Sequence, residues 1–87
     1  MAKRRDRYEI HAAILDVCKL DTNKTGIIHK ANLNFKRGEK HIDRLVKKEY
    51  LTSRQEDSRA IYSTTPEGMK YLENINKAIK MLKEHPL

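Results

Sequence analysis

The side chains best suited to chemistry in this 87-residue sequence are the cations of residues 34–48, NFKRGEKHIDRLVKK. Wound as a helix, the stretch has an apolar face made of Phe35, Ile42, Leu45 and Val46. The opposite face carries Lys36, Arg37, Lys40, Arg44 and Lys47. A core-facing stripe backed by a row of cations suits a helix that lies in a DNA groove. The alternative interpretation is that the charged face is only solvated.

Position along this predicted helix separates two kinds of DNA contact. Recognition helices contact base edges near their N-terminal end, and Arg or Lys there hydrogen-bonds guanine O6 and N7 in the major groove. The candidates for base contacts are Lys36, Arg37, Lys40 and His41. Cations further along the helix are expected to meet phosphates, which position a protein without reading sequence. The candidates for phosphate contacts are Arg44, Lys47 and Lys48.

Two further groups of cations are candidates for DNA backbone contacts. The N-terminal group is Lys3, Arg4, Arg5 and Arg7. It is expected either to follow the backbone or enter a minor groove, or to be only a soluble terminus. The second group is Arg54 and Arg59. These are expected to be minor contacts, because Glu56 and Asp57 between them would repel phosphate.

No pattern in the sequence indicates a catalytic, metal or cofactor site. Residues 21–28 imitate the start of a calcium loop, but Asn32 stands where the bidentate Glu is needed. His11, His29, His41 and His85 lack metal-ligand spacing. Cys18 falls on an apolar helical stripe, which indicates a core residue. We therefore expect no enzyme activity, no metal and no cofactor.

The elements that must position the cations follow from periodicity and capping signals. A first helix is predicted over residues 6–20, with Asp6 as its cap and Glu9 as the capping-box partner. Its predicted buried stripe is Ile10, Ala13, Ile14, Val17 and Cys18. A short second helix over residues 25–32 is expected to turn Ile27, Ile28 and Ala31 inward. The basic helix follows, capped by Asn34, and its Gly38 is expected to allow close approach of a neighbouring helix.

Beyond residue 50 the pattern changes to a hairpin and a last helix. Short β-prone runs at residues 51–53 and 60–63 flank a polar tip at residues 54–59. Thr65, Pro66 and Glu67 open a helix that is expected to stop at His85 and Pro86. Its apolar residues have the 3, 4, 3 spacing of a coiled-coil seam, although the same stripe would also suit packing on the protein's own core. They are Leu72, Ile75, Ile79 and Leu82.

Three helices, a hairpin and a final helix predict a winged helix-turn-helix of the mainly α (α+β) class, with a long C-terminal helix. Residues 1–64 are expected to form the DNA-binding domain and residues 65–87 the dimerisation helix, in one compact unit. The formal charge of +7 indicates an anionic partner. The start MAKRRDRYE lacks the apolar segment of a signal peptide, and no run reaches transmembrane length. A cytoplasmic, nucleoid-associated location without membrane contact is expected.

The sequence also resembles a known family, the small archaeal winged-helix regulators, some crenarchaeal members of which are abundant chromatin proteins. The resemblance rests on EIHAAILDVCK, on KTGIIHKANLNFK, on IDRLVKKEYL, and on Tyr62 followed by Thr65 and Gly68. It covers nearly the whole chain. Family members dimerise through an antiparallel coiled coil of the last helix, so the resemblance implies that role for Leu72, Ile75, Ile79 and Leu82.

The leading hypothesis is sequence-influenced binding of double-stranded DNA by a homodimeric transcriptional regulator or chromatin-associated protein. The alternative is a winged-helix module that binds protein in a transcription complex, with cations that only solvate it. RNA binding is disfavoured, because RNA readers usually stack bases on exposed aromatic side chains. This chain has one Phe, four Tyr and no Trp.

Overall fold

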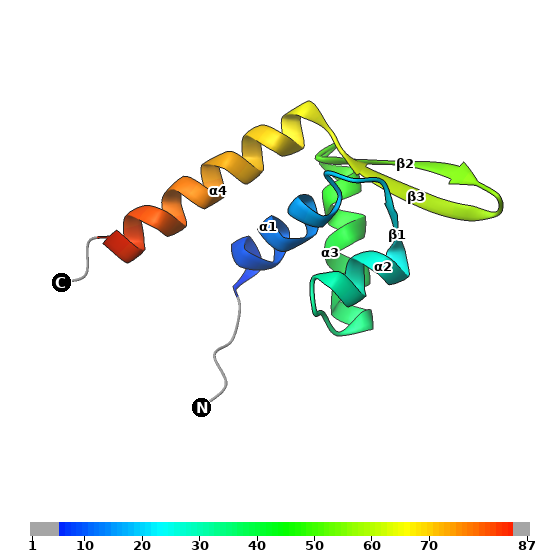
Figure 1. The fold of residues 1–87 in the computed structure, drawn as a ribbon, viewed down its shortest axis with the longest axis horizontal. Coiled ribbons are helices and arrows are strands. Elements are labelled where there is room, and N and C mark those ends of the chain that lie inside the picture. The colour runs from blue at the N-terminus through cyan, green and yellow to red at the C-terminus, as the bar shows by residue number, and fades with distance from the viewer. Residues whose placement is uncertain (1–5, 85–87) are drawn as a thin grey trace.

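The computed structural model describes residues 6–84, with the side chain of Glu84 left out. The elements along the chain are α1 (Arg7–Val17), β1 (Thr22–Asn23), α2 (Lys24–Lys30), α3 (Phe35–Lys47), β2 (Leu51–Glu56), β3 (Arg59–Thr64) and α4 (Pro66–Glu84). Helices α1, α2 and α3 cluster together, the β2–β3 hairpin projects from one side of them, and α4 runs to the other (Figure 1). The predicted winged-helix class is confirmed. The predicted stop at His85 and Pro86 lies outside the described residues.

Three of the helices begin where their capping residues predict. The Asp6 carboxylate accepts from the Glu9 backbone N–H at 2.8 Å, and Glu9 accepts in return from the Asp6 N–H at 3.3 Å. Asn34 accepts from the Arg37 N–H at 3.2 Å, which starts α3. The Thr65 hydroxyl accepts from the Gly68 N–H at 3.0 Å. Each cap satisfies an N–H that has no partner within its helix.

The sheet is antiparallel, in the order β1-β3-β2. Strands β2 and β3 pair from Leu51 opposite Thr64 to Glu56 opposite Arg59. Asp57 and Ser58 connect them with φ values of 48° and 66°, as a tight two-residue hairpin turn requires. The predicted hairpin is confirmed, but its polar tip is Asp57 and Ser58 rather than residues 54–59, because both strands continue almost to the turn. Strand β1 was not predicted, since two residues carry no periodicity.

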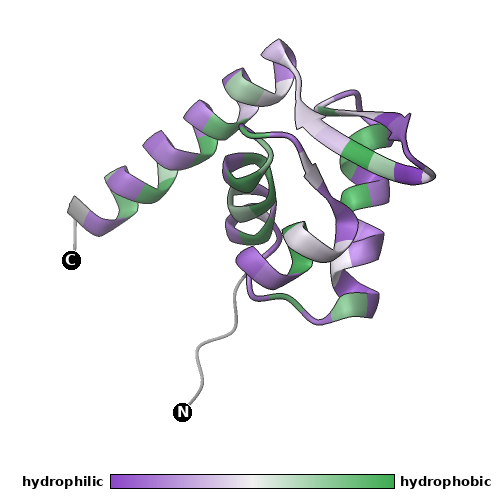
Figure 2. Ribbon diagram, turned by 45° about the vertical axis from the view of Figure 1, so that its right-hand side comes forward, coloured by the Kyte–Doolittle hydropathy of each residue, from purple (hydrophilic) through white to green (hydrophobic). Residues whose placement is uncertain are grey.

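The apolar core lies where α1, α2, α3 and the first residue of β2 meet. Its most completely buried large side chains are Ile14, Leu15, Ile27, Ile42, Leu45 and Leu51. Full burial of a Leu or Ile side chain contributes about 1.5–3 kcal/mol, so these six residues supply much of the stabilisation. In Figure 2 the ribbon of α1 is mostly green, whereas that of α4 alternates between green and purple.

Two predictions about buried faces need correction. Phe35 was expected to face the core but is 53% exposed, because it is the first residue of α3 and precedes the buried turn that contains Gly38. On α1, Ala13 and Val17 are only half-buried, and Leu15 is fully buried instead. Helix α1 contacts α2, α3 and α4, so it buries a wider arc than a one-sided stripe predicts.

The expected roles of Gly38 and of α2 are confirmed. Ile27, Ile28 and Ala31 are all buried. A Cβ atom on Gly38 would lie 2.9 Å from Cγ1 of Ile28, closer than such atoms pack. The glycine therefore allows α2 and α3 to approach closely. Among residues 6–84, no helix is long and apolar enough to cross a membrane.

Candidate nucleic-acid interface

The outer face of α3 is a surface of cations without carboxylate partners. We call its six exposed members the α3 cations: Lys36, Arg37, Lys40, Arg44, Lys47 and Lys48. Within the described part of the chain, no carboxylate forms an ion pair with any of them. Glu39 on the same helix is occupied elsewhere, because it pairs with Lys24 on α2 at 2.9 Å. The α3 cations are thus available to an external anion.

One carboxylate stands among the α3 cations, and sequence reasoning missed it. Asp43 is exposed and shares a hollow of about 430 Å³ on the outer surface of α3 with Lys40, Arg44 and Lys47. Its position was visible in the sequence, three residues after Lys40 and four before Lys47. An acid at this place would repel phosphate, yet it is able to accept a hydrogen bond from the amino group of cytosine.

His41, a predicted base contact, is turned toward the protein instead. Its ring is half-buried, and its Nδ1 lies 3.2 Å from Nε2 of His11 on α1. The Nδ1 of His11 in turn lies 2.8 Å from the hydroxyl oxygen of Tyr71 on α4. The three side chains form a polar chain that joins α3, α1 and α4. No sequence signal pointed to it, because its members lie 30 and 60 residues from His11.

Burial and nearby cations keep the two histidine rings of this polar chain neutral at neutral pH. His11 is 2% exposed, and burial lowers its pKa to about 4, helped by the charges of His41, Arg44, Arg7 and Lys48. Burial also lowers the pKa of His41, with Arg44 adding to the effect. A neutral His11 ring donates from one nitrogen and accepts at the other. This matches one bond to Tyr71 and one to His41.

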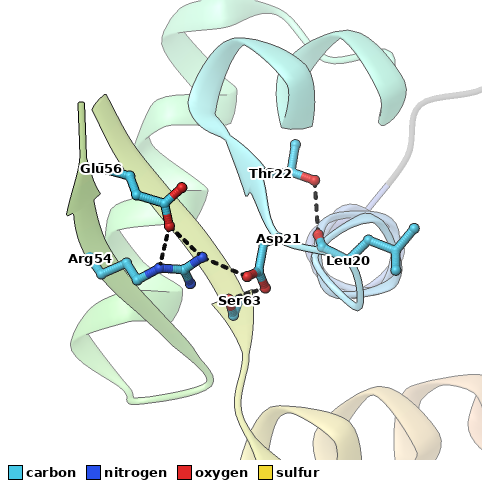
Figure 3. A network of polar contacts seen from close by, with 6 residues as sticks. All are labelled: Leu20, Asp21, Thr22, Arg54, Glu56 and Ser63. Atoms are coloured by element: carbon cyan, nitrogen blue, oxygen red, sulfur yellow. Dashed lines mark hydrogen bonds and ion pairs between the residues drawn. The ribbon is translucent and has the colours of Figure 1, made fainter. Parts of the chain in front are cut away.

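On the β2–β3 hairpin, Arg54 is in the opposite situation from the α3 cations. Nη2 of Arg54 lies 2.7 Å from the Asp21 carboxylate and 2.8 Å from that of Glu56. The Ser63 hydroxyl donates to the other Asp21 oxygen at 2.6 Å (Figure 3). This hydrogen bond and Arg54 lower the pKa of Asp21. The charge of Arg54 is therefore balanced by two acids.

The other predicted site residues are dispersed. Arg59 is exposed and borders a hollow of about 770 Å³ between β3 and α2, together with Lys24 and His29. Lys3, Arg4 and Arg5 lie outside the described residues. Cys18 is buried, and burial raises the pKa of its thiol to about 12. Within residues 6–84, no group of three or more potential metal ligands occurs.

The predicted seam on α4 divides into two parts. Leu72 and Ile75 are 3% and 6% exposed, and the chain's own core buries them. Ile79 is half-buried, whereas Leu82 is 78% exposed. An apolar hollow of about 320 Å³ runs between the start of α1 and α4, and Tyr8, Ile79 and Leu82 are among the residues that line it.

This arrangement defines a class of protein, in which α2 and α3 form a helix-turn-helix and the β2–β3 hairpin is the wing beside it. A family model described as winged helix-turn-helix matches residues 4–83, and the chain belongs to that family. The α3 cations lie on the second helix of the motif, at the place that recognition helices occupy in this class.

Comparison with solved structures gives a more specific similarity than the family model does. It is similar to Sso10a-2, a DNA-binding protein from Sulfolobus solfataricus, with 31% identity and a TM-score of 0.88 over 92% of this chain and 84% of that chain. The resemblance to small archaeal winged-helix regulators is thereby confirmed.

Two more distant structures show the fold alone. The transcriptional regulator BldR from Sulfolobus solfataricus has 14% identity and a TM-score of 0.73, over 86% of this chain and 56% of its own. AF1382 from Archaeoglobus fulgidus has 19% identity and a TM-score of 0.70, over 87% and 86%. A search of the curated proteins finds no match.

Proposed function

We propose that this protein binds double-stranded DNA through the outer face of α3, as a homodimeric transcriptional regulator or chromatin-associated protein. The observation that supports the proposal is the set of six exposed α3 cations, with which no carboxylate of residues 6–84 forms an ion pair. The similarity to Sso10a-2, which is a DNA-binding protein, supports it. The proposed role is binding rather than catalysis.

The proposed contacts follow from position on α3. Lys36, Arg37 and Lys40 lie in its first half and are proposed to read base edges. Arg44, Lys47 and Lys48 are proposed to contact phosphates. Asp43 joins the first group as a reader of cytosine. His41 is not proposed for a base contact, because its Nδ1 is engaged with His11.

A salt titration of DNA binding tests the proposal. Each neutralised phosphate releases counterions, so the logarithm of the affinity should fall linearly with the logarithm of salt concentration. If a dimer neutralises about 6–10 phosphates, affinity drops by about 10³–10⁵ between about 50 and 200 mM salt. Absence of binding, or a flat salt response, would favour the protein-binding module instead.

We further propose that a second copy of the chain covers the exposed end of α4. The partner is argued from the incomplete seam, because Ile79 and Leu82 continue the stripe that Leu72 and Ile75 begin but lack full burial. Met81 beside them is 61% exposed. Because Leu72 and Ile75 are already buried, the twofold axis of an antiparallel α4 pair should lie nearer Ile79 and Leu82.

The dimer is tested with Leu82→Lys, which changes an exposed residue and leaves the monomer's core intact. The variant places a charge in the proposed contact, where burial is costly, and should sediment as a monomer. Glu73→Gln adds the same unit of charge on an exposed position outside the seam and should remain dimeric. A wild-type monomer at tens of micromolar would contradict the proposal.

A further inference from the structure

A small hollow lies where α1, α3 and α4 meet, and it differs in character from the other hollows. Its volume is about 230 Å³. Three cations border it: Arg7 from the start of α1, Arg44 from α3, and Lys48 at the C-cap of α3. The buried ring of His11 forms part of its wall. Cations from different parts of the chain thus border one partly open hollow.

The cations of the hollow have no carboxylate to balance them. Within the described part of the chain, Arg7, Arg44 and Lys48 form no ion pair. All three charges reach the His11 ring and lower its pKa, in addition to the effect of burial and of His41. Three uncompensated positive charges beside a buried neutral ring attract an anion and repel a metal cation.

The remaining walls are aromatic. The rings of Tyr50 and Tyr71 stack with centroids 4.4 Å apart and planes 19° apart, and Tyr8 stands at the half-open rim. Flat aromatic walls favour a flat apolar body that carries the anionic group. The volume is below the usual range of about 300–1,000 Å³ for drug-sized ligands, so the ligand must be compact.

We propose that this hollow binds a small aromatic molecule through a carboxylate or phosphate group, which Arg7, Arg44 and Lys48 hold against the tyrosine walls. The ring of the ligand lies along Tyr8 and Tyr50. The site does not depend on the proposed DNA binding, because its ligand contacts the protein alone.

If the proposed DNA binding also holds, the ligand acts on it. Arg44 and Lys48 belong to both the hollow and the α3 cations, so an anion bound in the hollow neutralises charges that phosphates would otherwise meet. Ligand and DNA therefore weaken each other's binding by the same factor. This consequence rests on the proposed function, whereas ligand binding itself is measured on the protein without DNA.

Benzoate is the probe, with benzamide as an uncharged molecule of nearly the same shape. The signals of the His11 ring are followed by NMR during titration to about 10 mM, which saturates a site with a Kd of 1 mM or below. Benzoate should shift these signals saturably and raise the pKa of His11 toward its ordinary value, because it offsets the three cations. Benzamide should do neither.

Three variants assign the effect to the hollow. Arg7→Gln should weaken benzoate about 10-fold or more, since a hydrogen bond to a charged group is lost. Lys77→Gln removes the same charge from an exposed position on α4 that does not border the hollow and should leave benzoate binding unchanged. Tyr8→Ala, at an exposed residue, should weaken benzoate more than inorganic phosphate.

A DNA phosphate is the other possible source of the anion, and a second measurement separates it. If neither benzoate nor inorganic phosphate shifts His11, the proposal is wrong whatever the DNA result. In that case, a fall of about one in the salt slope of DNA binding for Arg7→Gln would assign the hollow to a backbone phosphate. Equal shifts from benzoate and benzamide would also overturn the proposal.

Discussion

Helix α3 and the wing both display arginine at the surface, and Arg54 of the wing differs from the arginines of α3 in its partners. Among the described residues no carboxylate forms an ion pair with Arg37 or Arg44, whereas Arg54 is held at 2.7 and 2.8 Å by two acids. To meet a phosphate, Arg54 must first give up charge-assisted hydrogen bonds, which are roughly twice as strong as neutral ones. Exposure and charge alone therefore do not define a DNA-binding surface, because the existing partners of each cation decide its availability.

The largest effect should come from removing two of the unbalanced cations together. Arg37→Ala with Lys40→Ala should weaken DNA binding by at least about 1–3 kcal/mol if either residue reads a base. Both side chains are exposed, so the fold should persist, and circular dichroism checks that it does. Unchanged affinity in the folded double variant would remove the distinction between α3 and the wing.

A smaller effect should follow when the acid among the α3 cations is neutralised. Asp43→Asn removes a negative charge from the proposed interface, so affinity for random DNA should rise by up to about 1 kcal/mol at low salt. Preference for C·G at one position should fall, since Asn accepts less strongly than a carboxylate. Competition binding with single-base operator variants measures both changes.

Asp16→Asn makes the same chemical change on α1, at an exposed acid that pairs with Lys19 at 3.1 Å. It should leave both quantities unchanged. If Asp16→Asn raised affinity as much as Asp43→Asn, net charge alone would explain the gain, and Asp43 would have no special position.

The smallest effect is expected in the wing. Arg54→Gln should change DNA affinity by less than about 0.5 kcal/mol, because its charge is already balanced and exposed ion pairs contribute little. Fluorescence anisotropy on the same duplex compares it with Lys40→Ala. A loss as large as that of Lys40→Ala would show that Arg54 leaves its acids when DNA binds.

Local signals in the sequence predicted the helices and their starts correctly. Asp6, Asn34 and Thr65 each cap a helix through contacts within three residues, so their roles depend on neighbouring sequence alone. The extent of the hairpin was less predictable, because polar residues 54–56 pair with β3 without an apolar alternation. Phe35 was wrongly predicted to be buried, because the apolar periodicity of α3 extends to its first residue. The apolar core does not reach that end of the helix.

The contacts between distant elements could not be predicted. The ion pair between Asp21 and Arg54 joins residues 33 apart. Nothing in the sequence around either residue indicates that the other is its partner. The chain of His11, His41 and Tyr71 depends on how α1, α3 and α4 pack. For His41, a predicted base contact, this packing brings Nδ1 to His11, a contact that the sequence did not indicate. Asp43 was different, because helical spacing alone places it among the cations.

The burial of Cys18 makes the chain its own reporter of unfolding kinetics. Cys18 is the one cysteine of the sequence, and its carbonyl accepts from the Thr64 N–H at 2.9 Å, so the thiol lies where α1 meets the sheet. Thiolate is the reactive form, and burial suppresses both its formation and its access. An alkylating reagent can therefore label this protein only while α1 and β3 are parted. At reagent concentrations where alkylation outpaces reclosing, the labelling rate thus counts opening events without any introduced probe.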